Sequence, residues 1–357
     1  MVGINVEGSP LPKYLKMLTP LCAISATLLN AQTLPAQDAN KLKIGFSIEA
    51  MKGERWQTDL DSFTARAKLS GAEVISSDAN GDDDLQFQQV RDMIHAGVKV
   101  LVLLPHDTNK AGRMVDAAKA ANIKVISYDR LALNSDIDLY LSFDRVEIGR
   151  MQAEYLVQRA PKGNYVLIAG SPNDEGAEAL HDEQMKVLRP SIDRGDIKVI
   201  ADFYTKEWQP TEAYLHMLQA IESAHGDIAA VLVSNDGMAT GVIQALREHN
   251  LAGKVLVSGQ DADLANIICV AQGTQAMTVY KPVPIEAAMA AEQAVHLAKG
   301  EQTDADRTIS NGQKTVPAIL LKPVLVTKEN IKATVVKDGF QTLKDINQGL
   351  SKDQQIN

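Results

Sequence analysis

The sequence predicts an α/β protein with two doubly wound parallel-sheet lobes and a ligand cleft between them. Apolar runs of strand length recur from residue 41 onward, and amphipathic segments of helix length separate most of them. A long helical segment at 145–160 divides the series into two similar halves. Strands that are apolar on both faces and alternate with helices indicate parallel sheets covered by helices on both sides.

Each half contains about five strand–helix units. In the first half the expected strands are 43–48, 73–77, 100–105, 124–129 and 139–144. In the second half they are 164–171, 197–203, 229–235, 254–261 and 277–282. The intervening segment 87–97 shows the helical pattern, because Phe87, Val90, Met93 and Ile94 share one face and Gly97 closes it.

The N-terminal segment differs from the rest of the chain. Two lysines precede an apolar run at 17–29, which small residues follow. This layout predicts a secretory signal peptide over residues 1–36, with cleavage after Ala31 or Ala36. The apolar run of about 13 residues is shorter than the roughly 20 that a membrane-spanning helix needs. We therefore expect an exported, periplasmic protein.

Composition narrows the classes of partner. The formal net charge of −9, from 45 acidic and 36 basic residues, disfavours nucleic acid and suits a soluble monomer. Once the predicted leader and its Cys22 are removed, Cys269 is the single cysteine, so we expect no intrachain disulfide.

Motifs for nucleotide binding and nucleophilic catalysis are missing. The chain has no dinucleotide-binding glycine loop, no phosphate-binding loop and no nucleophile elbow, and its histidines lack metal-ligand spacing. The segment 78–89 begins like a calcium loop but has Asp83 where the loop needs glycine and Gln89 where it needs glutamate. We read that segment as a turn with acidic residues at a helix N-terminus, and expect no enzyme, metal or cofactor.

Polar and aromatic side chains recur where the predicted strands end. In open parallel sheets, ligands bind beyond these carboxyl ends. Carboxylates opposite Arg, Lys or Asn suit the hydroxyl groups of a neutral sugar, and tryptophan offers a flat apolar face to the ring. The strand-end residues of both halves are Arg55, Trp56, Asp129, Arg130, Asn173, Asp174, Trp208, Asn235, Asp236, Asp261 and Lys281.

Simpler interpretations of single residues stay open. Asp236, before Gly237, suits a helix N-cap, and an Asp129–Arg130 pair can be a local ion pair. Trp208 can cover the edge of the core. All these residues recur at the same end of the predicted strands, and this recurrence favours a binding site.

The mature chain, from Lys41 to about Phe340, resembles the periplasmic sugar-binding proteins of ABC importers, and most of all their D-xylose-binding members. The resemblance rests on "GERWQ" (53–57), "SYDR" (127–130), "GNYVLIAGSPND" (163–174), "VSNDGMATGVIQAL" (233–246), "SGQDADLA" (258–265) and "TVYKP" (278–282). It implies a binding protein that delivers a monosaccharide to a membrane ABC permease. The implied sugar-contacting residues are Arg55, Trp56, Asp129, Arg130, Asp174, Trp208, Asn235, Asp261 and Lys281, with the two tryptophans flanking the ring.

The resemblance also implies a three-segment hinge, with crossings near 145, 282 and 315. The N-terminal lobe is then 41–145 plus 282–315, and the C-terminal lobe is 146–281 plus 316–357. Asp129 and Arg130 are expected to pair with each other as well as with sugar hydroxyls.

One departure from the family pattern concerns the sugar site: Gly176 stands where the family has a second asparagine. This puts the fine sugar specificity in doubt. A sensing module that signals to a membrane kinase or chemoreceptor is the alternative function. A sugar-responsive repressor domain is disfavoured by the leader.

Overall fold

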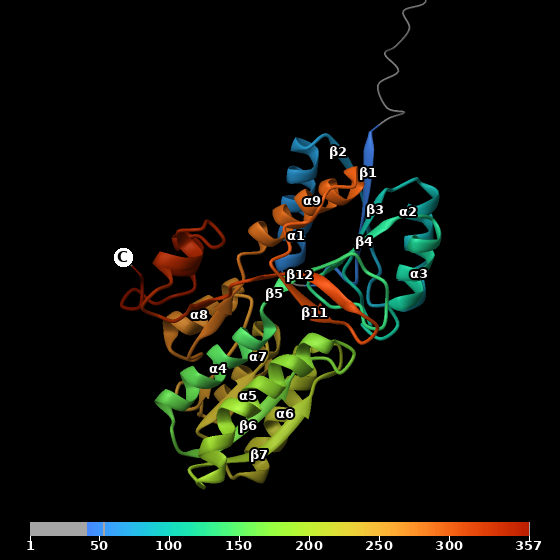
Figure 1. The fold of residues 1–357 in the computed structure, drawn as a ribbon. Coiled ribbons are helices and arrows are strands. Elements are labelled where there is room, and N and C mark those ends of the chain that lie inside the picture. Colours follow the sequence, from blue (N-terminus) through green and yellow to red (C-terminus); the bar gives the residue numbers. More distant parts are fainter. Residues whose placement is uncertain (1–40, 53, 357) are drawn as a thin grey trace, which may run out of the picture. The chain divides into compact units, whose positions relative to one another are not determined.

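The computed structural model describes residues 41–52 and 54–356 (Figure 1). The predicted leader lies outside these residues. Within them the fold class is the predicted one, an α/β protein of two lobes built on mainly parallel sheets. No helix of the described part is long and apolar enough to cross a membrane.

The first lobe is built around a seven-stranded sheet in the order β2-β1-β3-β4-β5-β12-β11. All neighbouring strands are parallel except β11, an edge strand antiparallel to β12. The chain reverses direction across the sheet between β1 and β3, and that reversal opens a crevice at their carboxyl ends. The strands are β1 (Leu42–Ile48), β2 (Ala72–Asp78), β3 (Val100–Leu103), β4 (Lys124–Tyr128), β5 (Leu139–Phe143), β11 (Arg307–Ser310) and β12 (Thr315–Leu321).

Helices cover both faces of this sheet, which explains why its strands are apolar throughout. Val100 and Val102 of β3 face α1 (Glu54–Leu69) and α9 (Val283–Lys299), whereas Leu101 and Leu103 face α2 (Asp83–His95) and α3 (Gly112–Ala120). Successive strand residues point to opposite faces, so each face needs its own apolar set.

The second lobe has a four-stranded parallel sheet in the order β7-β6-β8-β9. Helices α4 and α5 pack on one face, and α6 and α7 pack on the other. The elements are β6 (Gly163–Ala169), β7 (Ile197–Tyr204), β8 (Ala230–Val233), β9 (Leu256–Val257), α4 (Arg145–Arg159), α5 (Glu175–Asp193), α6 (Pro210–Ser223) and α7 (Asp236–Glu248).

The last two strands expected in the second half are shorter than predicted. Only Leu256–Val257 of 254–261 is a strand, and β10 (Thr278–Tyr280) pairs antiparallel with β13 (Val324–Val326). Hydrogen bonds from Val279 N to Gly259 O (3.1 Å) and from Asp261 N to Val279 O (2.8 Å) continue the ladder. Asp261 and the next residue have positive φ angles of 104° and 61°, so the extended conformation does not continue through them.

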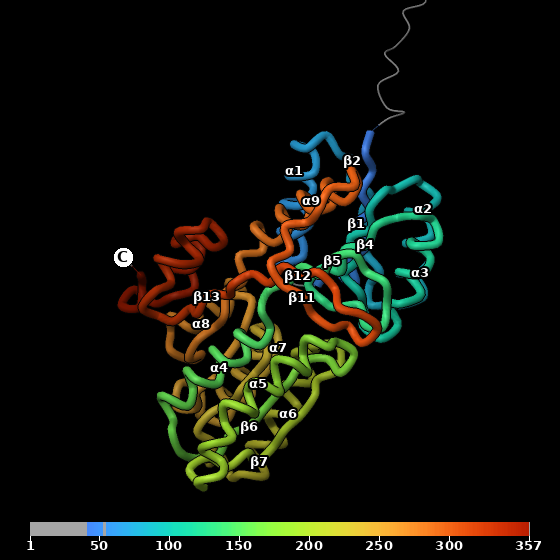
Figure 2. The backbone as a smooth tube through the Cα atoms, viewed as in Figure 1, coloured from blue at the N-terminus to red at the C-terminus, as the bar shows by residue number. Residues whose placement is uncertain are grey.

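Three segments join the lobes, and they can be followed in Figure 2. They lie between β5 and α4, between β10 and α9, and between β12 and β13. The predicted third crossing near 315, with the C-terminal lobe beginning at 316, is wrong. Residues 315–321 form β12, which pairs with β5 of the first sheet through Ala318 and Tyr140, so the crossing follows Leu321. The sequence pattern predicts no strand in this stretch.

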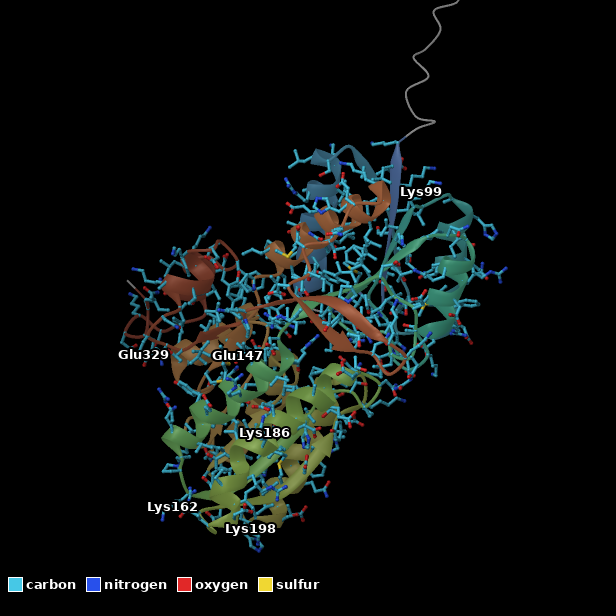
Figure 3. All side chains as sticks on the ribbon, viewed as in Figure 1. Lys99, Glu147, Lys162, Lys186, Lys198 and Glu329 are labelled. Carbon is cyan, nitrogen blue, oxygen red and sulfur yellow. The ribbon has the colours of Figure 1, made fainter. Side chains whose placement is uncertain are left out.

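The C-terminal residues belong to the second lobe. Helix α10 (Leu343–Gln348) packs beside α8 (Leu264–Gln272), and both contribute to an apolar cluster with β10 and β13. Lys99, which precedes β3, lies at the opposite end of the described structure from Lys162 and Lys198, at the amino ends of β6 and β7 (Figure 3). The carboxyl ends of the two sheets therefore face each other.

Candidate ligand-binding site

A cavity of about 340 Å³ lies at the carboxyl ends of the strands of both sheets. All nine residues that the sequence analysis singled out as sugar-contacting line this one cavity: Arg55, Trp56, Asp129, Arg130, Asp174, Trp208, Asn235, Asp261 and Lys281. Residues from both lobes thus meet at one place, at the small end of the size range of ligand pockets.

Helix N-termini fix two of these side chains. Asp174 caps α5 by accepting a hydrogen bond from Gly176 N (2.9 Å), and Asn235 caps α7 by accepting one from Met238 N (3.0 Å). The prediction that Asp236 is the cap was wrong by one residue. Asp236 is the first residue of α7 and is fully buried, and its carboxylate accepts a hydrogen bond from the Thr278 hydroxyl (2.9 Å). Asp236 therefore does not line the cavity and instead joins α7 to β10 by this hydrogen bond.

Asp129 is held by both its backbone and its side chain. Its φ of 57° is left-handed, a conformation that aspartate tolerates better than most residues. Its carbonyl oxygen accepts hydrogen bonds from the Tyr140 hydroxyl (3.1 Å), the Ser142 hydroxyl (2.7 Å) and Arg145 Nη2 (3.1 Å). Its carboxylate contacts Arg145 Nη2 at 2.6 Å and Arg55 Nη2 at 3.1 Å. These contacts hold the carboxylate in one orientation when the lobes are together.

The charge of Asp129 is also fixed. Burial opposes its ionisation, but the guanidinium groups of Arg145 and Arg55 and the ammonium of Lys281 outweigh burial and hold its pKa well below the usual range. Asp129 therefore offers a charged acceptor at any ordinary pH, and hydrogen bonds to charged acceptors are the stronger kind.

Arg130 pairs with different partners from those of Asp129. Its Nε lies 3.0 Å from Asp174 Oδ2, and its Nη2 lies 3.2 Å from Glu49 Oε1. Its Nη1 donates to the carbonyl oxygens of Pro105 and His106. The expected Asp129–Arg130 ion pair is thus wrong, because the two side chains contact different partners of opposite charge: Asp129 contacts Arg145 and Arg55, and Arg130 contacts Asp174 and Glu49. The Arg130–Asp174 contact joins the first lobe to the second.

Arg55 lies among four carboxylates. It contacts Asp59 (3.4 Å), Asp129 (3.1 Å), Glu286 (3.2 Å) and Asp261 (3.7 Å). Burial raises the pKa of Asp59 to about 6, although Arg55 partly offsets it. Burial and then the charge of Asp129 raise the pKa of Glu286 well above its usual value. The carboxyls behind Arg55 are thus easily protonated, whereas Asp129 stays charged.

Lys281 and Asp261 form an ion pair next to the second crossing. The Nζ–Oδ1 distance is 2.8 Å, and both groups are buried or nearly so. Burial and the neighbouring Arg55 lower the pKa of Lys281, and Asp261 partly restores it. Burial opposes the charge of Asp261, but Lys281 and Arg55 together keep its pKa below the usual value.

The two tryptophans line the cavity from different lobes. Trp56 is buried in the core of the first lobe, and the Arg55 guanidinium lies 4.1 Å from the centre of its ring. Trp208, in the short turn Lys206–Trp208 after β7, lies against Gly170 at the end of β6. A Cβ at Gly170 would be only 2.2 Å from Trp208 Cη2, so glycine is required for this ring position.

Direct contacts close the cavity between the lobes. Thr108 N of the first lobe donates to Asn173 O of the second (3.1 Å), and Glu175 N donates to the Thr108 hydroxyl (3.3 Å). The His106 ring bridges Asp83 Oδ1 (2.9 Å) and Glu207 Oε2 (2.8 Å), which belong to opposite lobes. The described structure is therefore the closed form.

The His106 bridge makes this closure sensitive to pH. Burial lowers the pKa of His106, but hydrogen bonds to Glu207 and Asp83 outweigh burial and raise it above its ordinary value of 6.5. Lys110, Asp107 and Lys52 are the neighbouring charges of this cluster. A raised pKa means that the stability contributed by the protonated ring is complete below pH 6.5, the value in the unfolded chain, and is lost as the pH rises through the raised value. The part of this contribution that comes from Glu207, the partner in the other lobe, favours closure.

Several buried polar atoms of the cavity wall make no hydrogen bond to the described residues: Asp129 Oδ1, Arg145 Nε, Trp208 Nε1, Gln260 Oε1 and Asp261 Oδ1. Asp129 Oδ1 and Asp261 Oδ1 are nevertheless ion-paired, with Arg55 Nη2 at 3.1 Å and with Lys281 Nζ at 2.8 Å. Within the described residues, the donors Arg145 Nε and Trp208 Nε1 and the acceptor Gln260 Oε1 are left without a partner. Buried polar groups are nearly always paired in native proteins. Donors and acceptors without partners around one cavity indicate a ligand that carries both kinds of group.

Arg145 was missed by the sequence analysis, although it lines the cavity beside the nine expected residues. A signal existed, because Arg145 directly follows a buried strand and Asp144, in the same kind of position as the residues that were chosen. Other wall residues were also missed, since they lie in turns that the strand pattern does not reach: Glu49, Lys52, Glu207, Gln209, Pro210, Gly237, Gln260 and Asp263.

The acidic segment 78–89 is a helix N-terminus, as predicted. Asp82 caps α2 by accepting hydrogen bonds from the backbone N–H groups of Asp84 (2.8 Å) and Leu85 (3.0 Å). Among residues 41–52 and 54–356, no group of three or more His, Cys, Asp or Glu side chains could hold a metal ion.

Comparisons with known proteins agree with this geometry. The model of the periplasmic binding protein domain matches residues 44–302. The chain is 46% identical to the D-xylose-binding periplasmic protein of Escherichia coli strain K12, over 92% of this chain and 98% of that protein. It is 45% identical to the protein of the same name from Haemophilus influenzae, over 90% and 97%.

A solved structure shares the fold. The ABC transporter solute-binding protein from Clostridium phytofermentans, with bound β-D-glucose, superposes with a TM-score of 0.80 at 30% identity, over 85% of this chain and 99% of that one. The matches cover both lobes and the residues around the cavity. The chain belongs to the periplasmic binding protein family and is a binding protein rather than an enzyme.

Proposed function

We propose that this protein captures a neutral monosaccharide, D-xylose in the first instance, by closure of its two lobes and delivers the sugar to an ABC importer. The observation that carries the proposal is a set of buried cavity-wall atoms that the described residues leave without a partner: the donors Arg145 Nε and Trp208 Nε1 and the acceptor Gln260 Oε1. Each unpaired buried polar group costs about 1–3 kcal/mol, so a polyhydroxyl ligand that pairs them stabilises the closed form.

The nine residues listed above are the proposed ligand contacts. Asp129 and Asp261 accept hydrogen bonds from sugar hydroxyls, while Arg55, Arg130 and Lys281 donate. The names of the relatives from Escherichia coli and Haemophilus influenzae support D-xylose, and the glucose-bound neighbour supports a pyranose ring.

Closure follows from the distribution of these contacts over the two lobes. Asp129 and Arg55 belong to the first lobe, whereas Asp174 and Trp208 belong to the second. A sugar contacts both sets only when the lobes are together, so it binds the closed form more tightly and shifts the population toward it.

The test is a calorimetric titration of the purified protein with a panel of pentoses and hexoses. Trp56 and Trp208 are the two tryptophans of the sequence, and both line the cavity, so a change in intrinsic fluorescence provides a second readout. We expect saturable 1:1 binding with D-xylose the tightest ligand. Absence of binding across the panel would refute the proposed function, and a tighter hexose would refute the choice of D-xylose.

Export by the leader is part of the same proposal. N-terminal sequencing of protein from an osmotic-shock fraction is expected to begin after Ala31 or Ala36. An intact Met1 in that fraction would contradict it.

A further inference from the structure

Arg145 lines the cavity but is not among the nine expected contacts. It is the first residue of α4 and directly follows Asp144, which caps that helix through Glu147 N (3.1 Å). The cap and the preceding strand β5 fix where its side chain starts. The residue is 8% exposed, and its side chain reaches the cavity.

The guanidinium of Arg145 is only partly used by the protein. Nη2 donates to both Asp129 Oδ2 (2.6 Å) and Asp129 O (3.1 Å), which holds the group in one plane. Nε is buried but makes no hydrogen bond to any described residue. An N–H group of an arginine is always a donor, so this atom requires an acceptor that the wall of the cavity does not provide.

Gly176 provides the space that this guanidinium occupies. A Cβ at position 176 would lie 3.2 Å from Arg145 Nε, 3.5 Å from Arg145 Cζ and 3.1 Å from Asp174 Oδ1. The first distance is tighter than ordinary carbon contacts, and a longer side chain at 176 would extend toward the guanidinium. The arginine and the glycine are thus sterically matched, although 31 positions separate them in the sequence.

We propose that Arg145, with Gly176 making room for it, is a specificity-determining residue that donates a hydrogen bond from Nε to one oxygen of the bound sugar. The inference rests on the proposed function and identifies the residue that recognises one oxygen of the bound sugar. Because a guanidinium donates and never accepts, the oxygen opposite it is a hydroxyl or ring oxygen that accepts.

The experiment compares wild type with Arg145→Met, which keeps much of the side-chain length but removes every donor. The probes are D-xylose, its monodeoxy derivatives taken one position at a time, and 5-thio-D-xylose, whose ring sulfur is a weak acceptor. Arg150→Met is the matched control, because Arg150 lies on the same helix with its side chain 42% exposed and pairs with Glu147 and Glu183, neither of which lines the cavity.

In wild type we expect one of these analogues to bind at least about tenfold more weakly than D-xylose. Arg145→Met should bind D-xylose at least about tenfold more weakly than wild type does. The variant should bind that same analogue as tightly as it binds D-xylose. Once the Arg145 donor is removed, loss of the sugar oxygen that accepts its hydrogen bond no longer weakens binding. A general structural defect would weaken every ligand by the same factor and leave the ratios unchanged.

A second pair of variants tests the role of Gly176. Gly176→Ala should weaken D-xylose binding at least about fivefold by displacing the guanidinium, and should cost nothing further in the Arg145→Met background. The inference would be overturned if the affinity losses of Gly176→Ala and Arg145→Met added in the double variant. It would also be overturned if the ratio of analogue to D-xylose affinity in Arg145→Met equalled that of wild type. Either result would leave the proposed sugar binding intact. If wild type binds none of these sugars, the proposed function itself has failed.

Discussion

Asp129→Asn is the most informative single substitution, because Asp129 is the centre of the buried ion-pair network. Its carboxylate contacts Arg145 at 2.6 Å and Arg55 at 3.1 Å, and Lys281 lies 3.9 Å away. Asparagine keeps the size of the side chain but removes its charge, so three buried cations lose a shared counter-charge.

The loss of stability can be estimated. Removing one partner of a buried ion pair costs about 3–5 kcal/mol, because an uncompensated charge stays buried. The unfolding entropy of globular proteins, about 2.1 cal/mol/K per residue, amounts to roughly 0.7 kcal/mol/K over the unit Lys41–Asn357. The melting temperature of the ligand-free variant should therefore fall by roughly 4–7 °C.

Affinity should fall as well. Asp129 is proposed to accept a charge-assisted hydrogen bond from a sugar hydroxyl, and its loss is expected to weaken D-xylose binding at least about tenfold, or about 1.4 kcal/mol. The assays are thermal unfolding without sugar and calorimetric titration with D-xylose. Asp136→Asn is the control, because Asp136 is half exposed and pairs with the partly exposed Lys119 and Lys314 away from the cavity, so both readouts should stay near wild type.

Two results would refute this reasoning. An Asp129→Asn variant that binds D-xylose as tightly as wild type would remove the centre of the proposed site. A variant that melts at or above the wild-type temperature would show that the network does not stabilise the ligand-free fold.

Three further predictions concern the cavity wall and the contact between the lobes. Trp208→Ala should weaken D-xylose binding by about 1–3 kcal/mol, measured by titration, with little change in ligand-free melting, and unchanged affinity would place the ring outside the site. Gly170→Ala should weaken binding to a similar extent, because its Cβ would clash with the Trp208 ring, and titration at wild-type strength would contradict that packing. In wild type, D-xylose affinity measured from pH 5.5 to 9 should decline as the pH rises through the raised pKa of His106, because the neutral ring loses its bridge to Glu207. Glu207→Gln should flatten that decline, and a profile as steep as that of wild type would exclude the bridge as its cause.

Much of the site could be predicted from the sequence because strand ends are local features. An apolar run that stops at Asp129 or Asn235 shows both the strand and the residue that follows it. Parallel packing then requires such residues to share one edge of a sheet. This is why nine residues that are far apart in the sequence line a single cavity.

The pairing of charges could not be predicted from the sequence. Asp129 and Arg130 are neighbours in the chain but have different partners, because Asp129 adopts a left-handed conformation and Arg145 and Asp174 come from the other lobe. The third crossing was misplaced for a related reason. Strand β12 is recognised by its pairing with β5, a contact between residues about 180 positions apart.

The sequence by itself therefore determined the fold class, the two lobes and the set of strand-end residues, because apolar periodicity and strand termination are encoded locally. Only the tertiary structure decided which charges neutralise each other, that His106 and Glu207 bridge the lobes, and that Gly176 makes room for Arg145. These features depend on distances between segments that lie far apart in the chain. Such distances exist only after the segments have packed.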